Sequence, residues 1–269
     1  MLLELSFKIM KIFIESSIAN VRSEPSNKSE LVAQLLFADT AILLNEFNEW
    51  GYISNEKYKI QGWISKKNYS PFIASNPENN NQINNKIVFY DLISFIYDEN
   101  KNKFPVFCGT IINDYKKINE NFYNINGKIF FIEDINKMKK ISSLKELALS
   151  FLNSPYLWGG NTFAGIDCSG LPFIVFKCLG INLYRNSYHQ VELGEEVFFI
   201  ENAKVGDLLF FGNEEKIYHV GIYLGNNQVL HSSGYVKIDY IDNYGIFDTK
   251  EKKYTHNLLR IKRILKNNL

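Results

Sequence analysis

The sequence has few cysteines and no long hydrophobic run. Its 269 residues include three cysteines, Cys108, Cys168 and Cys178, and no two of them form a Cys-x-x-Cys pair. An odd and sparse set predicts no disulfide framework, and without paired thiolates a zinc site of the thiolate type is not expected. No apolar stretch approaches the roughly 18 residues that a membrane-spanning helix needs. We therefore expect no membrane span, no metal and no cofactor.

The sequence also lacks an excess of charge of either sign. Thirty Lys+Arg residues against 29 Asp+Glu residues give a formal net charge of +1. Proteins dedicated to nucleic acids carry a basic excess because they neutralise phosphates, so no nucleic-acid partner is predicted. The hydrophobic share of 46% and the charged share of 22% are close to globular averages and exclude a disordered or collagen-like chain.

The first residues lack the pattern of a secretory signal peptide. Glu4, Lys8 and Lys11 interrupt the apolar residues, and no small-residue cleavage site follows them. We interpret this segment as part of the folded protein or as an over-long gene start, with Met10 as the true initiator. A cytoplasmic location is favoured, with the cell envelope or secretion as the open alternative.

The first half of the chain has the sequence pattern of short β-strands. Residues 10–75 are short apolar runs separated by turn residues, which is typical of a small barrel or sandwich. The Asn-rich stretch 76–85 has little apolar surface to bury and is predicted to be a linker. Residues 86–140 again have the sequence pattern of short β-strands. Within them, Asn126-Gly127 predicts a two-residue hairpin turn because both residues tolerate positive φ. We expect two small β modules.

From residue 142 onwards helix and strand signals alternate. Ser143 and Glu146 form a capping box that begins a helix, and Pro155 ends this segment. A second helix is predicted in DCSGLPFIVFKCLG, closed by Gly180. Strands are predicted in GDLLFFG, HVGIYLG and QVLHSS. Residues 142–269 are therefore expected to form a third domain of mixed α and β structure.

Cys168 is the candidate nucleophile of this third domain. Asp167 is placed to cap the second helix and Cys168 to open it, where the positive end of the helix dipole lowers the pKa of a thiol. A thiolate is the nucleophilic form of cysteine, and a neighbouring imidazole held by a further polar group completes its activation. The sequence therefore points to nucleophilic catalysis.

Two histidines can be placed beside each other by a hairpin. The predicted strands on either side of Gly225-Asn226-Asn227 pair so that Gly221 faces His231, provided that Leu224 faces Gln228. His219 and His231 then lie on one face as diagonal neighbours, roughly 7–8 Å apart at the backbone. The geometry thus permits Cys168, His219 and His231 to lie in one line of interacting side chains.

The remaining cysteines and histidines have simpler interpretations. Cys108 and Cys178 lie in apolar segments and are interpreted as small buried hydrophobes. His189 either lines a cleft or is a surface or core histidine whose hydrogen-bonding groups are satisfied. His256 lies in a charged stretch and is interpreted as solvated.

The ordered motifs of residues 142–269 resemble the NlpC/P60 family of cysteine peptidases. They are YLWGGNTFAGIDCSGL, GINLYRNSYHQ, KVGDLLFFG, HVGIYLG and VLHSSG. The resemblance implies a papain-like α+β fold with Cys168 as nucleophile, His219 as base and His231 as polar orienter. Because Tyr156 lies directly upstream of the cysteine loop, its hydroxyl is predicted to donate to an oxyanion, and Trp158 is packing or cleft wall. The oxyanion and substrate-binding residues expected on this basis are Tyr156, Asp167, Ser169, Trp158, Asn186, Ser187 and Gln190.

The first β module is similar to a bacterial SH3 domain. It carries a VR-x-x-PS start and a W-x-x-I…GWI spacing; the second module is SH3-like by position and texture. Two such modules before this peptidase domain resemble γ-D-glutamyl-L-diamino acid endopeptidases. That resemblance implies hydrolysis, through a Cys168 acyl-thioester, of the amide bond between γ-D-glutamate and diaminopimelate or lysine. The expected partners are short peptidoglycan-derived peptides with a free N-terminal L-Ala, and a monomer is favoured.

Two residues depart from the family pattern. Relatives often carry Arg-Asp-Ser where this chain has Asn186 between Arg and Ser, and a neutral Asn cannot pair with a substrate ammonium. A carboxylate elsewhere, such as Glu46 or Glu49, would then have to serve. Pro172 lacks the N–H that would bond the Cys168 carbonyl, so either the first helical turn is distorted or the helix starts late.

Two other functions compete with the peptidase. The same fold could act as an amidase or acyltransferase on a substrate outside peptidoglycan. Alternatively, the β modules could hold wall peptides while the catalytic domain is idle. The intact set of one cysteine and two histidines argues against an idle site.

Overall fold

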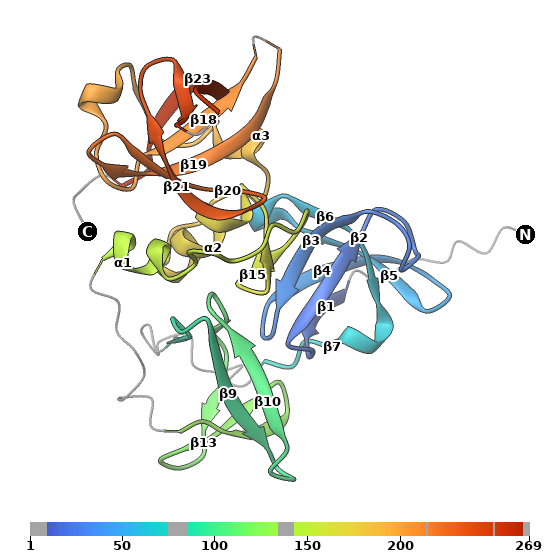
Figure 1. The fold of residues 1–269 in the computed structure, drawn as a ribbon. Coiled ribbons are helices and arrows are strands. Elements are labelled where there is room, and N and C mark those ends of the chain that lie inside the picture. Colours follow the sequence, from blue (N-terminus) through green and yellow to red (C-terminus); the bar gives the residue numbers. More distant parts are fainter. Residues whose placement is uncertain (1–9, 75–85, 134–142, 214, 250, 266–269) are drawn as a thin grey trace, which may run out of the picture. The chain divides into compact units, whose positions relative to one another are not determined.

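The computed structural model describes residues 10–74, 86–133, 143–213, 215–249 and 251–265 (Figure 1). The chain divides into two compact units, residues 1–139 and 140–269. The described part is mainly β with a few short helices, and none of its helices is long and apolar enough to cross a membrane. The stretch 76–85, predicted to be a linker, and the residues before Met10 lie outside the described part.

The first unit begins with a seven-stranded antiparallel sheet in the order β3-β2-β6-β5-β4-β1-β7. Short strands alternate here with tight turns, as the sequence pattern predicts. The strands are β1 (Met10–Ile14), β2 (Ile18–Arg22), β3 (Leu31–Leu36), β4 (Thr40–Phe47), β5 (Trp50–Asn55), β6 (Ile60–Ser65) and β7 (Tyr69–Pro71), with 3-10 turns η1 (Glu56–Tyr58) and η2 (Lys66–Asn68).

A second, five-stranded sheet in the same unit has the order β10-β9-β14-β13-β12, beside a two-stranded sheet of β11 and β8. The predicted hairpin at Asn126-Gly127 is confirmed: φ is 50° and 84° at these residues, and Ile125 pairs with Lys128. The strands are β8 (Ile87–Val88), β9 (Ile93–Asp98), β10 (Lys103–Phe107), β11 (Ile111–Ile112), β12 (Lys116–Lys117), β13 (Phe122–Ile125) and β14 (Lys128–Phe131).

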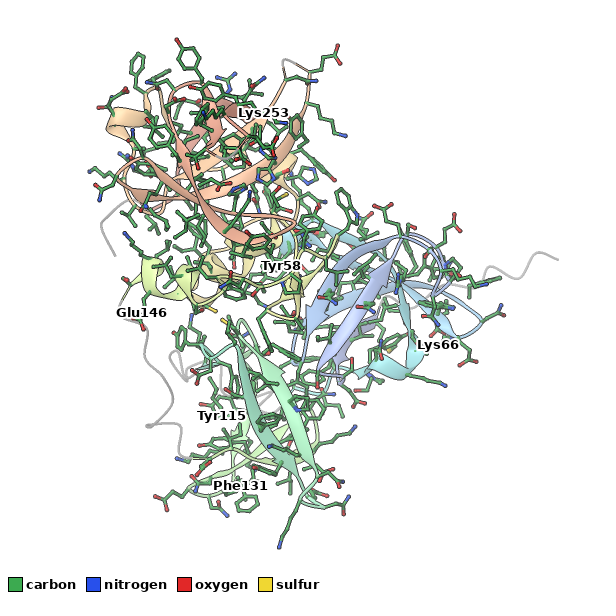
Figure 2. The ribbon with its side chains drawn as sticks, in the orientation of Figure 1. Tyr58, Lys66, Tyr115, Phe131, Glu146 and Lys253 are labelled. Atoms are coloured by element: carbon green, nitrogen blue, oxygen red, sulfur yellow. The ribbon has the colours of Figure 1, made fainter. Side chains whose placement is uncertain are left out.

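The two parts of the first unit share one hydrophobic core. Phe37, from the loop after β3, packs edge-on against Phe104 and Phe130 of the second sheet, with ring centroids 5.0 and 5.4 Å apart. The Asn126 side chain accepts from the Ile73 N–H at 2.6 Å and donates to the Pro71 carbonyl at 3.1 Å. Tyr115, labelled in Figure 2, packs against the same cluster. The second sheet therefore covers apolar surface that the first would otherwise expose.

The second unit is built on an antiparallel sheet in the order β17-β23-β18-β19-β20-β21-β22. An additional pairing of β22 with β23 closes this sheet on itself. The helices α1 and α2 lie beside the sheet, and α2 contacts β19 (Figure 1). The elements are α1 (Leu144–Leu149), β15 (Asn161–Thr162), β16 (Gly165–Ile166), α2 (Gly170–Cys178), α3 (Ser187–Gln190), β17 (Glu195–Val197), η4 (Ile200–Asn202), β18 (Leu208–Gly212), β19 (Ile217–Gly225), β20 (Gln228–Ser233), β21 (Tyr235–Ile241), β22 (Gly245–Asp248) and β23 (Lys253–Arg263).

The predicted start of α1 and the predicted end of α2 are confirmed, whereas α1 already ends at Leu149, well before Pro155. The Ser143 hydroxyl accepts from the Glu146 N–H at 3.2 Å and caps α1. Helix α2 ends where Gly180 adopts a φ of 78°, and the next N–H reaches back to the Phe176 carbonyl. Every residue of α2 is buried, because its apolar residues surround the helix on all sides.

Strand β18 lies in the middle of the second unit. Its residues are all buried, which explains why LLFF is a continuous apolar run rather than an alternating one. Leu209 and Phe211 belong to a core cluster on one face, with Tyr223 and Val229 from the neighbouring strands. The packed core thus lies beneath the sheet whose strands β19, β20 and β21 carry the polar side chains.

Candidate active site

The β19–β20 hairpin brings the two histidines together as the sequence predicts. Gly221 pairs with His231 as predicted, but the assumed pairing of Leu224 with Gln228 is wrong, because Gly225 pairs with Gln228 and a β-bulge lies between Tyr223 and Gly225. The turn is Asn226-Asn227, with φ of 51° and 54°. His219 is 5% exposed and His231 is 0% exposed. Their rings meet edge to face, and His219 Nε2 lies 2.8 Å from His231 Nδ1. The two imidazoles are therefore directly hydrogen-bonded inside the protein.

Cys168 lies just before α2 and next to β19. Its Sγ is 4.0 Å from the Tyr218 carbonyl oxygen and also accepts from the Val220 N–H, so it contacts the strand on both sides of His219. The expectation that Cys168 opens the helix is wrong, because α2 begins at Gly170. The reason is Pro172, which has no N–H to donate to the Cys168 carbonyl, and the helix starts late.

The expected lowering of the Cys168 pKa by the helix dipole is not found. Burial raises the pKa of the thiol to about 12, and the nearby Asp167 carboxylate adds to the rise, while backbone N–H groups of Val220 and Ser169 oppose it. Burial also holds the pKa of His219 well below 6.5. At neutral pH the Cys168 thiol and the His219 imidazole are therefore both neutral.

A third residue, Asp239, continues the line of hydrogen bonds. His231 Nε2 lies 3.0 Å from Asp239 Oδ2, and Lys237 Nζ lies 2.9 Å from the same oxygen. These hydrogen bonds lower the pKa of Asp239 to about 2, so it is a carboxylate at neutral pH. The sequence analysis did not single out Asp239.

Arg185 is a second residue that the sequence analysis did not place in the site. It is 1% exposed. Its guanidinium donates to both Asp167 oxygens, at 3.0 and 2.7 Å, and also to Ser169 Oγ and the Gly160 carbonyl. Asp167 in turn accepts from the N–H of Gly170, the first residue of α2, at 2.7 Å, although the N-cap position itself is Ser169 and not Asp167 as predicted. The buried ion pair thus fixes the backbone on both sides of Cys168.

The residues of α3 support this loop from the other side. Gln190 is 0% exposed, and its Nε2 donates to the carbonyls of Ser169 and Tyr184. Ser187 is also buried, whereas Asn186 is partly exposed and its amide donates to the Tyr188 hydroxyl at 2.9 Å. Asn186 is thus the most accessible of the three predicted residues on this segment.

The two aromatic residues upstream of Cys168 differ in exposure. Tyr156 is partly buried, and burial together with Cys168 and Asp167 raises the pKa of its hydroxyl to about 12, so it is a neutral donor beside the thiol. Trp158 is 59% exposed, and so the structure leaves a large apolar surface near the cysteine loop.

The interpretation of His256 as a solvated residue is wrong. Its ring stacks on the ring of His219, with centroids 4.3 Å apart and planes 29° apart. His256 pairs with Ile246, where the long β23 runs alongside β22, and this pairing turns it toward the histidines. Burial lowers the pKa of His256 to about 4. The charged residues beside His256 in the sequence favoured the interpretation as a solvated side chain and gave no indication of this placement.

Among the described residues, no group of His, Cys, Asp and Glu side chains has the arrangement of a metal site. The sequence model of the NlpC/P60 family matches residues 153–261 of this chain. This segment contains every residue of the site. This chain carries an NlpC/P60 domain.

Two known proteins are similar to this chain, one over a short segment and the other over most of its length. Gamma-D-glutamyl-L-lysine dipeptidyl-peptidase of Bacillus subtilis (strain 168) is 45% identical over 85 residues, which is 30% of this chain and 28% of that protein. Dipeptidyl-peptidase 6 of Lysinibacillus sphaericus is 24% identical over 246 residues, covering 83% of this chain and 88% of that protein. This chain therefore spans little more than a quarter of the length of the first relative and most of the second.

A solved structure shares the fold of nearly the whole chain. The crystal structure of an NlpC/P60 family protein from Bacillus cereus ATCC 10987 superposes with a TM-score of 0.73. The match covers 95% of this chain and 99% of that chain at 19% sequence identity. The β-rich first unit is therefore part of a known architecture and not peculiar to this chain.

We expect acid to destabilise the NlpC/P60 domain already at pH values above those at which most carboxylates titrate. Burial lowers the pKa of His219, His231 and His256, the last to about 4, against about 6.5 in the unfolded chain. Below pH 6.5 the unfolded state then binds more protons than the folded state. The stabilisation is complete above pH 6.5 and is lost as the pH falls toward 4, by up to about 1.4 kcal/mol per pH unit for each histidine.

Urea unfolding at pH 7.5, 6.5 and 5.0 measures this loss. His256→Gln removes one titrating group and should lose less stability over the same range than the wild type. Equal or higher stability of the wild type at pH 5.0 would show that the histidines are not held neutral by the fold.

Proposed function

We propose that this chain is a cysteine peptidase that hydrolyses the γ-D-glutamyl–L-diamino acid amide bond of short peptidoglycan stem peptides. The observation that carries the proposal is the buried His219–His231 pair, hydrogen-bonded at 2.8 Å, in which His219 lies on β19, the strand whose backbone contacts the Cys168 thiol. A thiol next to an oriented imidazole is the arrangement that acyl transfer needs. The Bacillus subtilis relative is named a gamma-D-glutamyl-L-lysine dipeptidyl-peptidase, which supports the choice of bond.

In the proposed reaction, His219 is the general base. Its Nε2 is engaged by His231, which leaves Nδ1 for the proton of the Cys168 thiol. Because thiol and imidazole are both neutral beforehand, the proton moves to His219 as sulfur attacks the amide carbonyl. His219 then protonates the departing amine, and an acyl-thioester forms on Cys168. A water deprotonated by His219 hydrolyses the thioester and restores the thiol.

The negative charge that develops on the carbonyl oxygen needs donors. The Tyr156 hydroxyl stays protonated beside Cys168 and is the proposed side-chain donor. Asp167 and Ser169 are proposed to act through the Arg185 network, which holds the cysteine loop, and Gln190 does the same through the Ser169 carbonyl. Trp158, Asn186 and Ser187 are proposed to line the substrate path.

The remainder of the chain fits an accessory role in this proposal. We propose that residues 10–75 and 86–140 are SH3-like modules and that residues 142–269 form the catalytic domain with a papain-like fold. The small antiparallel sheets of the first unit and the helix-and-sheet build of the second support this division.

Defined peptides test the proposed function. The chain is incubated with L-Ala-γ-D-Glu-L-Lys, with its meso-diaminopimelate analogue, and with an N-acetylated version of each, and products are identified by mass spectrometry. We expect release of the L-Ala-γ-D-Glu dipeptide from at least one free peptide, and none with Cys168→Ala. The acetylated peptides report whether a free amine is needed when Asn186 replaces a carboxylate. Cleavage at another bond, or none, would contradict the proposed substrate.

His219 and His231 are not expected to be equivalent. His219→Ala removes the base, so its rate should fall nearly to that of Cys168→Ala. His231→Asn keeps a hydrogen-bonding group beside His219 and should retain measurable activity. The two rates on one peptide, together with the pH dependence of Cys168 alkylation, decide the roles. A His231→Asn enzyme slower than His219→Ala would reverse them.

A further inference from the structure

Asp239 reaches His231 because of the strand register in the sheet. Strand β21 pairs with β20 so that His231 faces Lys237 and Val229 faces Asp239. Asp239 is thus a diagonal neighbour of His231, on the same face of the sheet. Its Oδ2 is 3.0 Å from His231 Nε2. Asp239 therefore ends a hydrogen-bonded line that begins at His219.

An ionised carboxylate decides which nitrogen of each ring carries the proton. A carboxylate only accepts, so the proton of a neutral His231 lies on Nε2 and points to Asp239. His231 Nδ1 is then an acceptor, and the bond to His219 Nε2 must be donated by His219. The proton of a neutral His219 therefore lies on Nε2, and its Nδ1 carries the free lone pair.

The geometry points to Asp239 as a positioning residue: through His231 it fixes His219 in the tautomer whose Nδ1 accepts the proton of Cys168. The inference rests on the proposed function, since it assigns a role within that site. Two observations support it. Both imidazoles are buried and receive no bulk water that could reorient them, at 5% and 0% exposure. Lys237 donates to the same Oδ2 at 2.9 Å and holds the carboxylate in place.

The reverse arrangement shows why the carboxylate matters. Without an obligatory acceptor at position 239, His231 can carry its proton on Nδ1 and donate it to His219 Nε2. His219 then carries its proton on Nδ1, so that nitrogen has no lone pair with which to accept the proton of the thiol. Removing the carboxylate should therefore impair proton transfer without moving any group that touches the substrate.

Asp239→Asn is the variant that tests this role, because an amide can donate as well as accept. Asp242→Asn is the matched control: Asp242 lies just after the same strand, where it accepts from the Tyr254 hydroxyl and from the turn that follows. We expect Asp239→Asn to lower kcat by roughly one to three orders of magnitude with little change in KM, and Asp242→Asn to lower neither.

Nitrogen NMR of ¹⁵N-histidine-labelled protein gives a readout that a purely structural role would not move. With the wild type at neutral pH, we expect His219 and His231 each to carry one proton, on Nε2. With Asp239→Asn, we expect signals of the Nδ1-protonated forms to appear, and with Asp242→Asn the wild-type pattern. The rate of Cys168 alkylation should fall in parallel for Asp239→Asn only.

These outcomes separate the inference from the proposed function. A wild-type spectrum with a proton on Nδ1 of either histidine overturns the inference without any variant. So does an Asp239→Asn protein that keeps both the wild-type tautomers and the wild-type alkylation rate. If the wild type cleaves none of the peptides but shows the expected tautomers and their loss in Asp239→Asn, the proposed substrate fails and the positioning role stands.

Discussion

Replacing Cys168 with alanine is expected to lower the rate of peptide hydrolysis by about five to six orders of magnitude, as removal of a nucleophile does in other hydrolases. No other described thiol can take its place, because Cys108 and Cys178 are each 2% exposed in apolar surroundings. The fold should survive, since the hydrogen-bond partners of the thiol are backbone groups of β19 and of Ser169, which the sheet and the cysteine loop already hold in place.

Cys178→Ala is the control for this comparison. It makes the same chemical change in the buried end of α2, and we expect it to keep full activity while losing about 1 kcal/mol of stability through the cavity it leaves. Rates on the best peptide and thermal unfolding of both variants give the test. If Cys168→Ala retains a few per cent of wild-type activity, the nucleophile is another residue.

Replacing Arg185 with methionine is expected to give the largest loss of stability of any single change in the second unit. The Arg185–Asp167 pair is almost completely buried, at 1% and 9% side-chain exposure. Breaking such a pair leaves an uncompensated charge in the interior, which typically costs about 3–5 kcal/mol. Activity should fall as well, because Asp167 and Ser169 flank Cys168 and lose the same guanidinium.

Arg260→Met is the matched control for Arg185. Its partner is Glu196 at 3.6 Å, and the Arg260 side chain is 60% exposed. An exposed pair of this kind contributes about 0–1 kcal/mol, so urea unfolding should separate the two variants clearly. The double variant Arg185→Met, Asp167→Asn should recover part of the loss, because it removes the stranded charge. Equal stability of the Arg185 and Arg260 variants would show that the buried pair does not hold the fold.

Local signals in the sequence were sufficient for the turn of the hairpin, the start of α1 and the end of α2. Asn226 and Asn227 tolerate positive φ and form the predicted turn, and a β-bulge between Tyr223 and Gly225 then brings Gly221 opposite His231. The Ser143 cap and the Gly180 terminus follow from groups within a few residues of each helix end. Such features depend on neighbours in the chain, and so a single sequence predicts them.

The support around the histidines depends instead on residues that meet only in the folded chain. Asp239 lies on a third strand, and its contact with His231 requires the β20–β21 register, which the sequence analysis did not predict. Arg185 reaches Asp167 from a loop 18 residues away. A charged residue in a sequence is most often solvated, so neither its burial nor its partner could be predicted.

His256 shows how local charge can mislead. The stretch around it is polar, but β23 pairs with β22 on one side and with β18 on the other, and this closure of the sheet places the His256 ring on His219. The shared core of the first unit was missed for a related reason. Phe37 follows a strand of one module but packs into the other, which only the tertiary fold determines.

The most direct test of the account is to identify the covalent intermediate. The chain is mixed with L-Ala-γ-D-Glu-L-Lys, the reaction is quenched in acid within its first turnovers, and the protein is digested and mapped by mass spectrometry. The account predicts an L-Ala-γ-D-Glu acyl group in thioester linkage on Cys168, removed by hydroxylamine and absent from Cys108 and Cys178. Product formation with no acyl group on Cys168, or with one on another residue, would contradict it.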